Sequence, residues 1–356
     1  MNRIAVVGCG YWGPNFVRNF SQLPDAEVAL CCDLSEKRLA HMRKLYPFVK
    51  TTNRLDAVLE DPTINAVVIA TPVTSHFRIG SACLKAGKHV LIEKPIAPSA
   101  RDVSKLIALA DEHKLILMGG HTFLFNAAVL KVKEYIESGE LGDIFYINTT
   151  RVNLGIFQED INVIWDLAPH DVSILNFILG ARPRAVAAHG RPYIQEKIED
   201  VAFITLEYPN DVIANVHVSW LDPNKIRRTT IVGSKKMLVY DDVATLEKIR
   251  VYDKGVTVQP HYDTFGEFQL AYRFGDIYIP RVDDAEPLKI ECQSFLESIR
   301  TGKAPRSSGR EGLAVVETLE AAQRSLRSGG RVIVVDRESA PSRPRGARAA
   351  AKRGRR

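Results

Sequence analysis

The hydrophobic positions of the chain follow one rhythm up to about residue 120 and another beyond it. In the first part, short runs that are apolar throughout, such as "RIAVVG" and "NAVVIAT", alternate with longer segments of helical periodicity. Strands that are apolar throughout are buried on both faces, and the helices between them supply the crossovers of a parallel sheet. We therefore expect residues 1–122 to form an α/β domain with a doubly wound parallel sheet.

Beyond Gly142 the apolar and polar residues alternate, as in "VAFITLEY", "VIANVHVSW", "RTTIVGS" and "KMLVYDD". This period of two is typical of strands with one buried face. Two amphipathic segments, "PLKIECQSFLESIRTG" and "REGLAVVETLEAAQRSLRSGG", and a last strand, "RVIVV", complete the pattern. We expect residues 123–336 to form a C-terminal α+β domain with an open, largely antiparallel sheet.

The length and composition agree with two domains of a globular protein. The chain has 356 residues, of which 46% are hydrophobic and 25% charged, and its apolar runs are too short to span a bilayer. Its start, "MNRIAVVGCG", enters a strand-like run without the pattern of a secretory signal. We predict a cytoplasmic protein that does not cross a membrane.

The net charge of +6 is concentrated at the C-terminus. Residues 337–356 contain eight basic residues and one acidic residue, so the rest of the chain is almost neutral. This segment is rich in Pro, Ala and Arg and cannot bury much apolar area, which predicts a disordered basic tail. It is either a solvated extension or an anchor for polyanions such as nucleic acid.

The cysteines argue against a stabilising framework of disulfides or zinc. They are odd in number, without a C-x-x-C pair and without a histidine at metal-ligand spacing. They are Cys9, Cys31, Cys32, Cys83 and Cys292. We predict no disulfide and no metal site.

The run "VVGCGYWGPN" places Gly8, Gly10 and Gly13 in a G-x-G-x-x-G pattern between a strand and a helix. The first glycine allows a tight turn, the second lets the backbone approach a pyrophosphate, and the third permits close helix packing. We predict a Rossmann dinucleotide-binding domain, with Tyr11 and Trp12 of the loop beside the cofactor. A purely structural tight turn is the alternative.

Asp33 ends the second strand-like run, where a carboxylate can bind the ribose hydroxyls of a dinucleotide. Because this carboxylate would repel a 2′-phosphate, NAD is favoured over NADP. Lys37 and Arg38 lie in the same region and would weaken the preference for NAD, unless they are only exposed residues on a helix face. We count Arg38 among the cofactor-binding residues, and NADP stays open.

The run "IATPVTSH" places Thr71, Pro72 and His76 at the end of a further strand. The carboxyl ends of parallel strands border the ligand crevice, so we predict that these residues contact the cofactor. A Thr-Pro pair can also serve simply to end a strand.

Candidate chemistry follows the next strand, where "VLIEKP" contains Glu93 and Lys94. A lysine over a cofactor crevice can hold or deprotonate a substrate hydroxyl, because partial desolvation lowers its pKa. Further along, "VIWDLAPHD" places Asp166 four residues before His170, on one face of a helix. This second pair is either a proton-transfer pair or a helix N-cap followed by a buried histidine.

The motifs "GCGYWG", "TPVTSH", "EKP" and "DLAPHD", in this order, resemble those of the Gfo/Idh/MocA oxidoreductases. The resemblance covers about residues 2–336 and leaves out the basic tail. It implies a Rossmann domain followed by an open-faced sheet domain, with NAD(P) and a sugar or cyclitol between them. It also implies a homodimer or homotetramer formed through the open sheet.

The resemblance implies that Lys94 is the active-site lysine and that Asp166 and His170 form the family's D-x-x-x-H pair. We assign the general base to His170, with Lys94 polarising the same substrate oxygen and Asp166 orienting both. Lys94 as the base is the alternative.

Neighbouring residues are assigned by the same resemblance and by position. We place Glu93 and His121 beside the cofactor, and Asn126 and Trp165 beside the substrate. His121 as a core histidine and Trp165 as a packing residue are the alternatives. Asp171 is a further carboxylate that either orients His170 or caps the helix.

The wider pattern, with "GHTFLFN", "NLGIF" and "EPLKIECQSF", resembles the branch that acts on nucleotide-linked amino sugars, including UDP-N-acetylglucosamine 3-dehydrogenases. This implies NAD-dependent oxidation of a sugar 3-hydroxyl for cell-envelope glycans. Lys225, Arg227 and Arg228 would bind the pyrophosphate of such a substrate, unless they form an exposed turn. The alternatives are a dehydrogenase of a free sugar or inositol and a non-catalytic NAD-binding regulator or scaffold.

Overall fold

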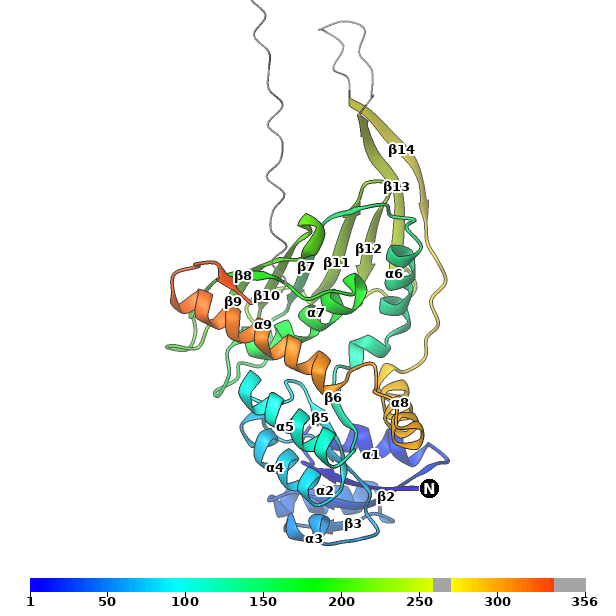
Figure 1. Ribbon diagram of the computed structural model, residues 1–356, viewed down its shortest axis with the longest axis vertical. Coiled ribbons are helices and arrows are strands. Elements are labelled where there is room, and N and C mark those ends of the chain that lie inside the picture. Colours follow the sequence, from blue (N-terminus) through cyan, green and yellow to red (C-terminus); the bar gives the residue numbers. More distant parts are fainter. Residues whose placement is uncertain (259–269, 336–356) are drawn as a thin grey trace, which may run out of the picture.

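A computed structural model gives the structure of the chain and describes residues 1–258 and 270–335. It contains two sheets, one above the other, with helices between and around them (Figure 1). The predicted basic tail, residues 337–356, lies outside the described residues. In the part of the chain that the structure describes, no helix is long and apolar enough to cross a membrane.

The first sheet is parallel and six-stranded, in the order β3-β2-β1-β4-β5-β6, as the apolar runs predicted. Its strands are β1 (Asn2–Val7), β2 (Ala26–Cys32), β3 (Lys50–Thr52), β4 (Ala66–Ile69), β5 (His89–Glu93) and β6 (Leu117–Gly120). The strand order reverses direction between β1 and β4, so a crevice opens at the carboxyl end of β1. The glycine pattern follows directly after this strand.

Helices cover both faces of the parallel sheet. They are α1 (Gly13–Ser21), α2 (Glu36–Leu45), α3 (Asp56–Leu59), α4 (Val73–Lys85) and α5 (Ala100–Glu112). Side chains of β1 alternate between the two cores, with Ile4 and Val6 facing α1 and α2, and Ala5 and Val7 facing α3 to α5. All four are almost fully buried, which explains why the strand is apolar at every position.

The second sheet is nine-stranded, in the order β14-β13-β12-β11-β7-β10-β9-β8-β15. Its strands are β7 (Ile144–Val152), β8 (Ala185–Arg191), β9 (Val201–Glu207), β10 (Ile213–Ser219), β11 (Ile226–Gly233), β12 (Met237–Asp241), β13 (Ile249–Val258), β14 (Leu270–Tyr278) and β15 (Ile333–Val334). All neighbouring pairs are antiparallel except β7 and β10, so the expected open, largely antiparallel sheet is confirmed. The sequence interpretation missed β8, β13 and β14.

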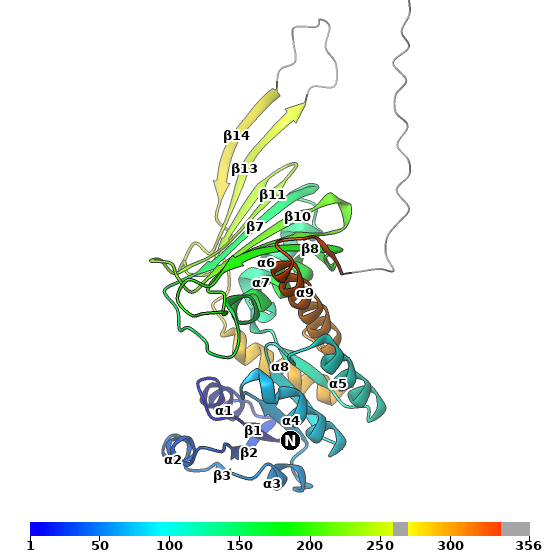
Figure 2. The ribbon, with the colours of Figure 1, turned by 90° about the vertical axis from the view of Figure 1, so that its left-hand side faces the viewer.

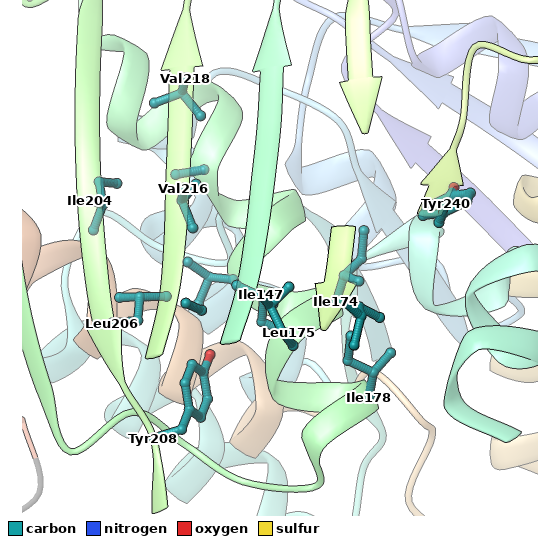
Figure 3. Packing of buried hydrophobic residues seen from close by; sticks show 14 of the residues in the cluster. Ile147, Ile174, Leu175, Ile178, Ile204, Leu206, Tyr208, Val216, Val218 and Tyr240 are labelled. Carbon is teal, nitrogen blue, oxygen red and sulfur yellow. The ribbon is translucent and has the colours of Figure 1, made fainter. Parts of the chain in front are cut away.

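Most helices of the second half lie on one face of this sheet, and the opposite face carries no helix among the described residues (Figure 2). The helical elements are η1 (Thr122–Phe125), α6 (Ala127–Glu137), α7 (Val163–Leu179), η2 (Pro209–Asp211), α8 (Pro287–Thr301) and α9 (Gly309–Arg327). Figure 3 shows the contact, in which Leu175 and Ile178 of α7 lie against strand residues such as Ile147. This core holds α7 firmly under the sheet.

Helix α8 does not stay with the second sheet, although its residues lie within the segment 123–336. Leu288, Cys292 and Phe295 are buried in the same cluster as Ile4 and Phe16. The chain therefore leaves the first domain after β6 and returns to it at α8 (Figure 1). The amphipathic pattern predicted this helix correctly but does not reveal which core covers its apolar face.

Candidate active site

The glycine loop is shaped by close backbone contacts at two of its three glycines. Gly8 has a φ of +98°, and a Cβ there would lie 2.6 Å from the carbonyl of Ala70. A Cβ on Gly13 would lie 2.2 Å from the oxygen of Gly8, whereas one on Gly10 would meet nothing within 4 Å. Gly8 and Gly13 are therefore required by packing, and Gly10 leaves open space next to the loop.

Helix α1 begins at this loop without a side-chain cap, since its N-cap residue Trp12 makes no capping hydrogen bond. Uncapped N–H groups and the helix dipole favour an anion at this position. Tyr11 and Trp12 form an edge-to-face pair with ring centroids 5.4 Å apart and extend from the loop. The open space and the free donors together fit a dinucleotide pyrophosphate.

Asp33 is held by the backbone on both sides of the crevice. Its Oδ2 accepts from the N–H of Cys9 at 2.7 Å, and its Oδ1 accepts from the N–H of Ser35 at 2.8 Å. The Arg38 guanidinium approaches Oδ2 at 3.6 Å. The structure thus brings Asp33 and Arg38 together beside the glycine loop, while Lys37 is exposed.

The sequence led us to expect His76 at the crevice surface, but in the structure this residue is buried. Its ring is 1% exposed, with Nδ1 2.9 Å from the carbonyl oxygen of Pro95 and Nε2 2.7 Å from that of Thr71. The ring ties the loop after β4 to the loop after β5. Thr71 and the exposed Pro72 lie at the start of α4, next to the glycine loop.

A cavity of about 340 Å³ and another of about 640 Å³ lie near the centre of the molecule, and the larger one extends from the glycine loop to the second sheet. Many predicted site residues line the larger one, which we call the substrate cavity. They are Tyr11, Trp12, Glu93, Asn126, His170 and Arg227. Its volume is within the usual range for small-molecule sites.

Lys94 and Asp166 are in direct contact, and although their neighbours Glu93 and His170 line the substrate cavity, these two residues do not. The Lys94 Nζ donates to the Asp166 carbonyl oxygen at 2.7 Å and to its Oδ1 at 3.2 Å. The other carboxylate oxygen, Oδ2, accepts from the indole Nε1 of Trp220 at 3.0 Å. Both oxygens of Asp166 are thereby fixed, and Trp220 is a site residue that the sequence interpretation missed.

Asp166 is not the N-cap of its helix. Helix α7 begins at Val163, and Asn162 caps it by accepting from the N–H of Trp165. Asp166 and His170 therefore lie on the first two turns. The capping alternative for Asp166 is wrong because Asn162 already fills that role.

His170 lines the substrate cavity, and its ring packs edge-to-face with Phe123 at a centroid distance of 5.0 Å. The pKa of His170 lies well below that of an ordinary histidine, because burial and the positive charges of Lys94 and Arg151 disfavour its protonated form. Within the described residues, its Nδ1 has no hydrogen-bond partner. The imidazole is thus neutral near pH 7, and the same burial and charges make it a weak base.

Asp171 forms a buried ion pair with Arg151, which was not singled out from the sequence. Arg151 Nε donates to Asp171 Oδ2 at 2.7 Å, and both side chains are about 5% exposed. The guanidinium also lies 4.7 Å from the centroid of Phe123, the ring that packs on His170. Asp171 therefore does not cap the helix, and it acts on His170 only through this cluster.

Buried titratable groups lie behind the reactive residues. Burial raises the pKa of Glu93 to about 7 and lowers the pKa of His121 to about 4. Glu291 of α8 is fully buried, accepts from the hydroxyl of Thr122 at 2.7 Å, and has a pKa raised by burial and by Glu93. His121 is 1% exposed, so the structure supports its reading as a core histidine.

Asn126 and Arg227 both donate to the carboxylate of Asp242, a residue that the sequence interpretation did not single out. Asn126 caps α6 and donates from Nδ2 to Asp242 Oδ1 at 3.4 Å. Arg227 Nη1 donates to Asp242 Oδ2 at 3.4 Å, and the Tyr240 hydroxyl donates to Oδ1 at 2.9 Å. Trp165 packs against the cores of both domains, which favours its packing role.

Two family models match the chain. One is described as an oxidoreductase family with an NAD-binding Rossmann fold and matches residues 2–121. The other is described as a GFO/IDH/MocA C-terminal domain and matches residues 129–239. Together they span most of both sheets and the glycine loop.

Curated relatives include enzymes with different substrates. Myo-inositol 2-dehydrogenase of Thermotoga maritima is 25% identical over 342 residues, covering 91% of this chain and 96% of that protein. UDP-N-acetylglucosamine 3-dehydrogenase of Acidithiobacillus ferrooxidans is 27% identical over 266 residues, covering 72% and 79%. The solved structure of GenD2 from gentamicin A biosynthesis, in complex with NAD, has a TM-score of 0.79 at 23% identity, covering 94% of this chain and 96% of that one.

Proposed function

Because the chain belongs to the Gfo/Idh/MocA family of oxidoreductases, we propose that it oxidises a hydroxyl of a nucleotide sugar with NAD as the hydride acceptor. Its relatives are sugar and inositol dehydrogenases, so the enzyme acts on CH–OH groups of this class. The observation that carries the proposal is the contact of Lys94 with Asp166, four residues before His170, which lines a cavity that begins at the glycine loop.

NAD, when bound, supplies the electrophilic carbon that accepts hydride. The glycine loop and the start of α1 would hold its pyrophosphate, and Asp33 would accept from the adenosine ribose hydroxyls. We propose NAD rather than NADP, since the fixed carboxylate of Asp33 would repel a 2′-phosphate. Arg38 is close enough to Asp33 to weaken this preference.

The protein's own residues would handle the proton of the substrate hydroxyl. His170 is neutral near pH 7 and lines the cavity, so we assign it the role of general base. Lys94 would donate to the same oxygen and stabilise the negative charge that develops as the proton leaves. Asp166, held by Trp220, keeps the Lys94 ammonium pointing toward this position.

The finer substrate, the 3-hydroxyl of a sugar such as UDP-N-acetylglucosamine, is supported by cations on the cavity wall. Lys225, Arg227 and Lys248 of the second domain line the substrate cavity and can bind a diphosphate. Arg228 does not line it and pairs instead with Asp241 at 2.9 Å. We retain the role in cell-envelope glycan synthesis as part of this proposal.

A free sugar or inositol is the second candidate substrate, because carboxylates also line the cavity. Asp242, Asp283 and Asp284 would accept from polyol hydroxyls, and the inositol dehydrogenase relative is as similar as the nucleotide-sugar enzyme. Such a substrate would not need the cations.

The test measures NADH absorbance with the enzyme at substrate-like concentration, comparing UDP-N-acetylglucosamine, myo-inositol and glucose, with His170→Asn as the inactive control. Reduction with the nucleotide sugar alone supports the proposal, and reduction with free polyols alone replaces it by the second candidate. Arg227→Gln should raise KM for the nucleotide sugar about tenfold, the typical effect of losing one charge-assisted contact. Arg228→Gln is the matched control and should leave KM unchanged.

We further propose a homodimer or homotetramer formed through the uncovered face of the second sheet. Large apolar side chains are exposed on its strands, including Tyr146, Phe203 and Ile213. Exposed apolar area of this kind commonly marks a protein interface. Mass photometry of the protein at nanomolar concentration, with Phe203→Glu as the disrupting variant, tests this assembly.

A further inference from the structure

We propose that the cavity of about 340 Å³, which we call the rear cavity, binds a small organic anion carrying a carboxylate or a phosphate ester. It is distinct from the substrate cavity but shares two elements with it. Leu124 of η1 lines the rear cavity, while Thr122 and Phe123 of the same turn line the substrate cavity. Helix α7 likewise contributes His170 to one cavity and Asn176 to the other.

The first support is an arginine without a carboxylate partner. The Arg306 guanidinium donates to the carbonyl oxygen of Leu124 at 2.8 Å and lies over the rings of Phe125 and Phe177, 5.1 and 5.7 Å from their centroids. No ion pair is formed by this side chain among the residues that the structure describes. Arg306 is an exposed residue whose partial burial lowers its pKa, and its charge lies on the cavity wall without a counter-ion. A bound anion would supply that counter-ion.

Two further cations line the rear cavity. Lys133 Nζ donates to the carbonyl oxygen of Phe177 at 2.8 Å and pairs with Glu137 at 2.9 Å. Among the described residues, Arg182 donates only to the carbonyl oxygen of Arg310, at 3.3 Å. Glu311 is the one carboxylate on the described lining, so the wall is positive overall.

Two buried side chains on the lining have unused hydrogen-bonding atoms. Asn176 accepts from the hydroxyl of Tyr208 at 2.7 Å through Oδ1, but its Nδ2 has no partner in the described part of the chain. Both ring nitrogens of His121 are likewise unpartnered. These side chains are 7% and 1% exposed, and buried polar groups are normally paired. Their unpartnered atoms are covered by protein, however, so the anion would be bound by the three cations on the wall and not by these two side chains.

The arrangement defines the class of ligand. Guanidinium and ammonium donors favour an oxyanion, while Glu311 favours a hydroxyl on the same molecule. Leu124, Phe177 and Val315 supply apolar surface for its carbon skeleton. A small hydroxylated carboxylate or a sugar-sized phosphate ester combines these features and suits the volume.

The experiment titrates citrate, and separately inorganic phosphate, into the full-length protein saturated with NAD, by isothermal titration calorimetry at constant ionic strength. Saturating NAD occupies the anion-binding start of α1, so binding there is not counted. The variants are Arg306→Gln and, because Arg306 packs on two rings, Lys133→Gln as a second test. Arg310→Gln is the matched control, since this arginine is 68% exposed, pairs with Asp111 and loses the same charge nearby.

We expect citrate to bind the wild type and the Arg310→Gln variant alike, and to bind the Arg306→Gln and Lys133→Gln variants about tenfold more weakly. Phosphate binding with the same pattern would assign the site to the free ion, and citrate binding alone to organic anions. No binding of either probe to the wild type overturns the proposal. Equal binding to all four proteins also overturns it, as does a loss of binding in Arg227→Gln, which would move the anion to the substrate cavity.

Discussion

The cofactor side and the reactive side of the candidate active site are built in different ways. The cofactor side consists of backbone, since Gly8, Gly10 and Gly13 are neighbours in the chain and shape the loop through their missing side chains. The reactive side consists of side chains from distant elements, with Lys94 after β5, Asp166 on α7 and Trp220 after β10. A local motif can specify the first, whereas the second depends on how two domains pack.

The strongest test of this contrast removes the charge on the reactive side and leaves the backbone side intact. Lys94→Met should lower kcat by about a thousandfold, because losing a positioned donor to the negative charge that develops in the transition state typically has an effect of this order. NAD affinity, measured by fluorescence titration, should change little. A parallel loss of NAD affinity would show that the two sides are not independent.

The next test separates the glycines of the cofactor side. Gly13→Ala should destabilise the protein by about 2 to 4 kcal/mol, because its Cβ would collide with the oxygen of Gly8. Gly10→Ala should fold with near-normal stability, since its Cβ meets nothing, yet bind NAD about tenfold more weakly by filling the space next to the pyrophosphate. Urea unfolding and NAD titration measure the two effects. Equal destabilisation by both substitutions would contradict this division.

A smaller effect is expected at the residue that holds Asp166. Trp220→Phe keeps most of the ring but removes the N–H donor, and kcat/KM should fall about tenfold, as expected for one hydrogen bond to a charged group. Trp165→Phe is the matched control, because that indole packs between the cores. If both variants lose the same activity, Trp220 acts through packing and not through Asp166.

The smallest effect concerns stability against pH. His121 has a folded pKa of about 4, below its unfolded value, so its stabilisation is complete above about pH 6.5 and is lost as pH falls toward 4. Between pH 7 and pH 5, His121→Gln should therefore lose about 1 to 2 kcal/mol less stability than the wild type. Urea unfolding at both pH values checks this. Glu93 works in the opposite direction, since its raised pKa of about 7 removes stability as pH rises from about 4.5 to 7.

Much of the fold was predictable because burial imposes a period on the sequence. The parallel strands are apolar at each position, and β9 to β12 alternate cleanly. The hairpin of β13 and β14 was missed because it extends beyond the helices that cover the sheet (Figure 1), so exposed residues such as Tyr272 and Phe274 give no buried face. The domain boundaries at 122 and 336, and the cytoplasmic location, stay predictions.

The site was predictable where residue type and position in a motif agree. Gly8, Gly13, Asp33 and the Lys94–Asp166 contact fall into this class. Trp220 and Asp242 could not be found, because a tryptophan after a strand or an aspartate in a turn carries no local signal of its partner. The prediction that His76 lies at the crevice was wrong because its position after a strand is ambiguous. Residues that follow a strand can border the crevice, but they can also connect neighbouring loops, as His76 does.

The return of α8 to the first sheet also limits how the protein can move. The chain crosses between the two sheets after β6 and again before α8, where Glu286 pairs with Arg18 of α1 at 3.0 Å. A third crossing follows α8, because α9 contacts α5 and β6 of the first domain as well as α7 and β8 of the second. Three connections leave the two domains fewer relative motions than a single linker would, so we expect the contact between Lys94 and Asp166 to persist while ligands exchange.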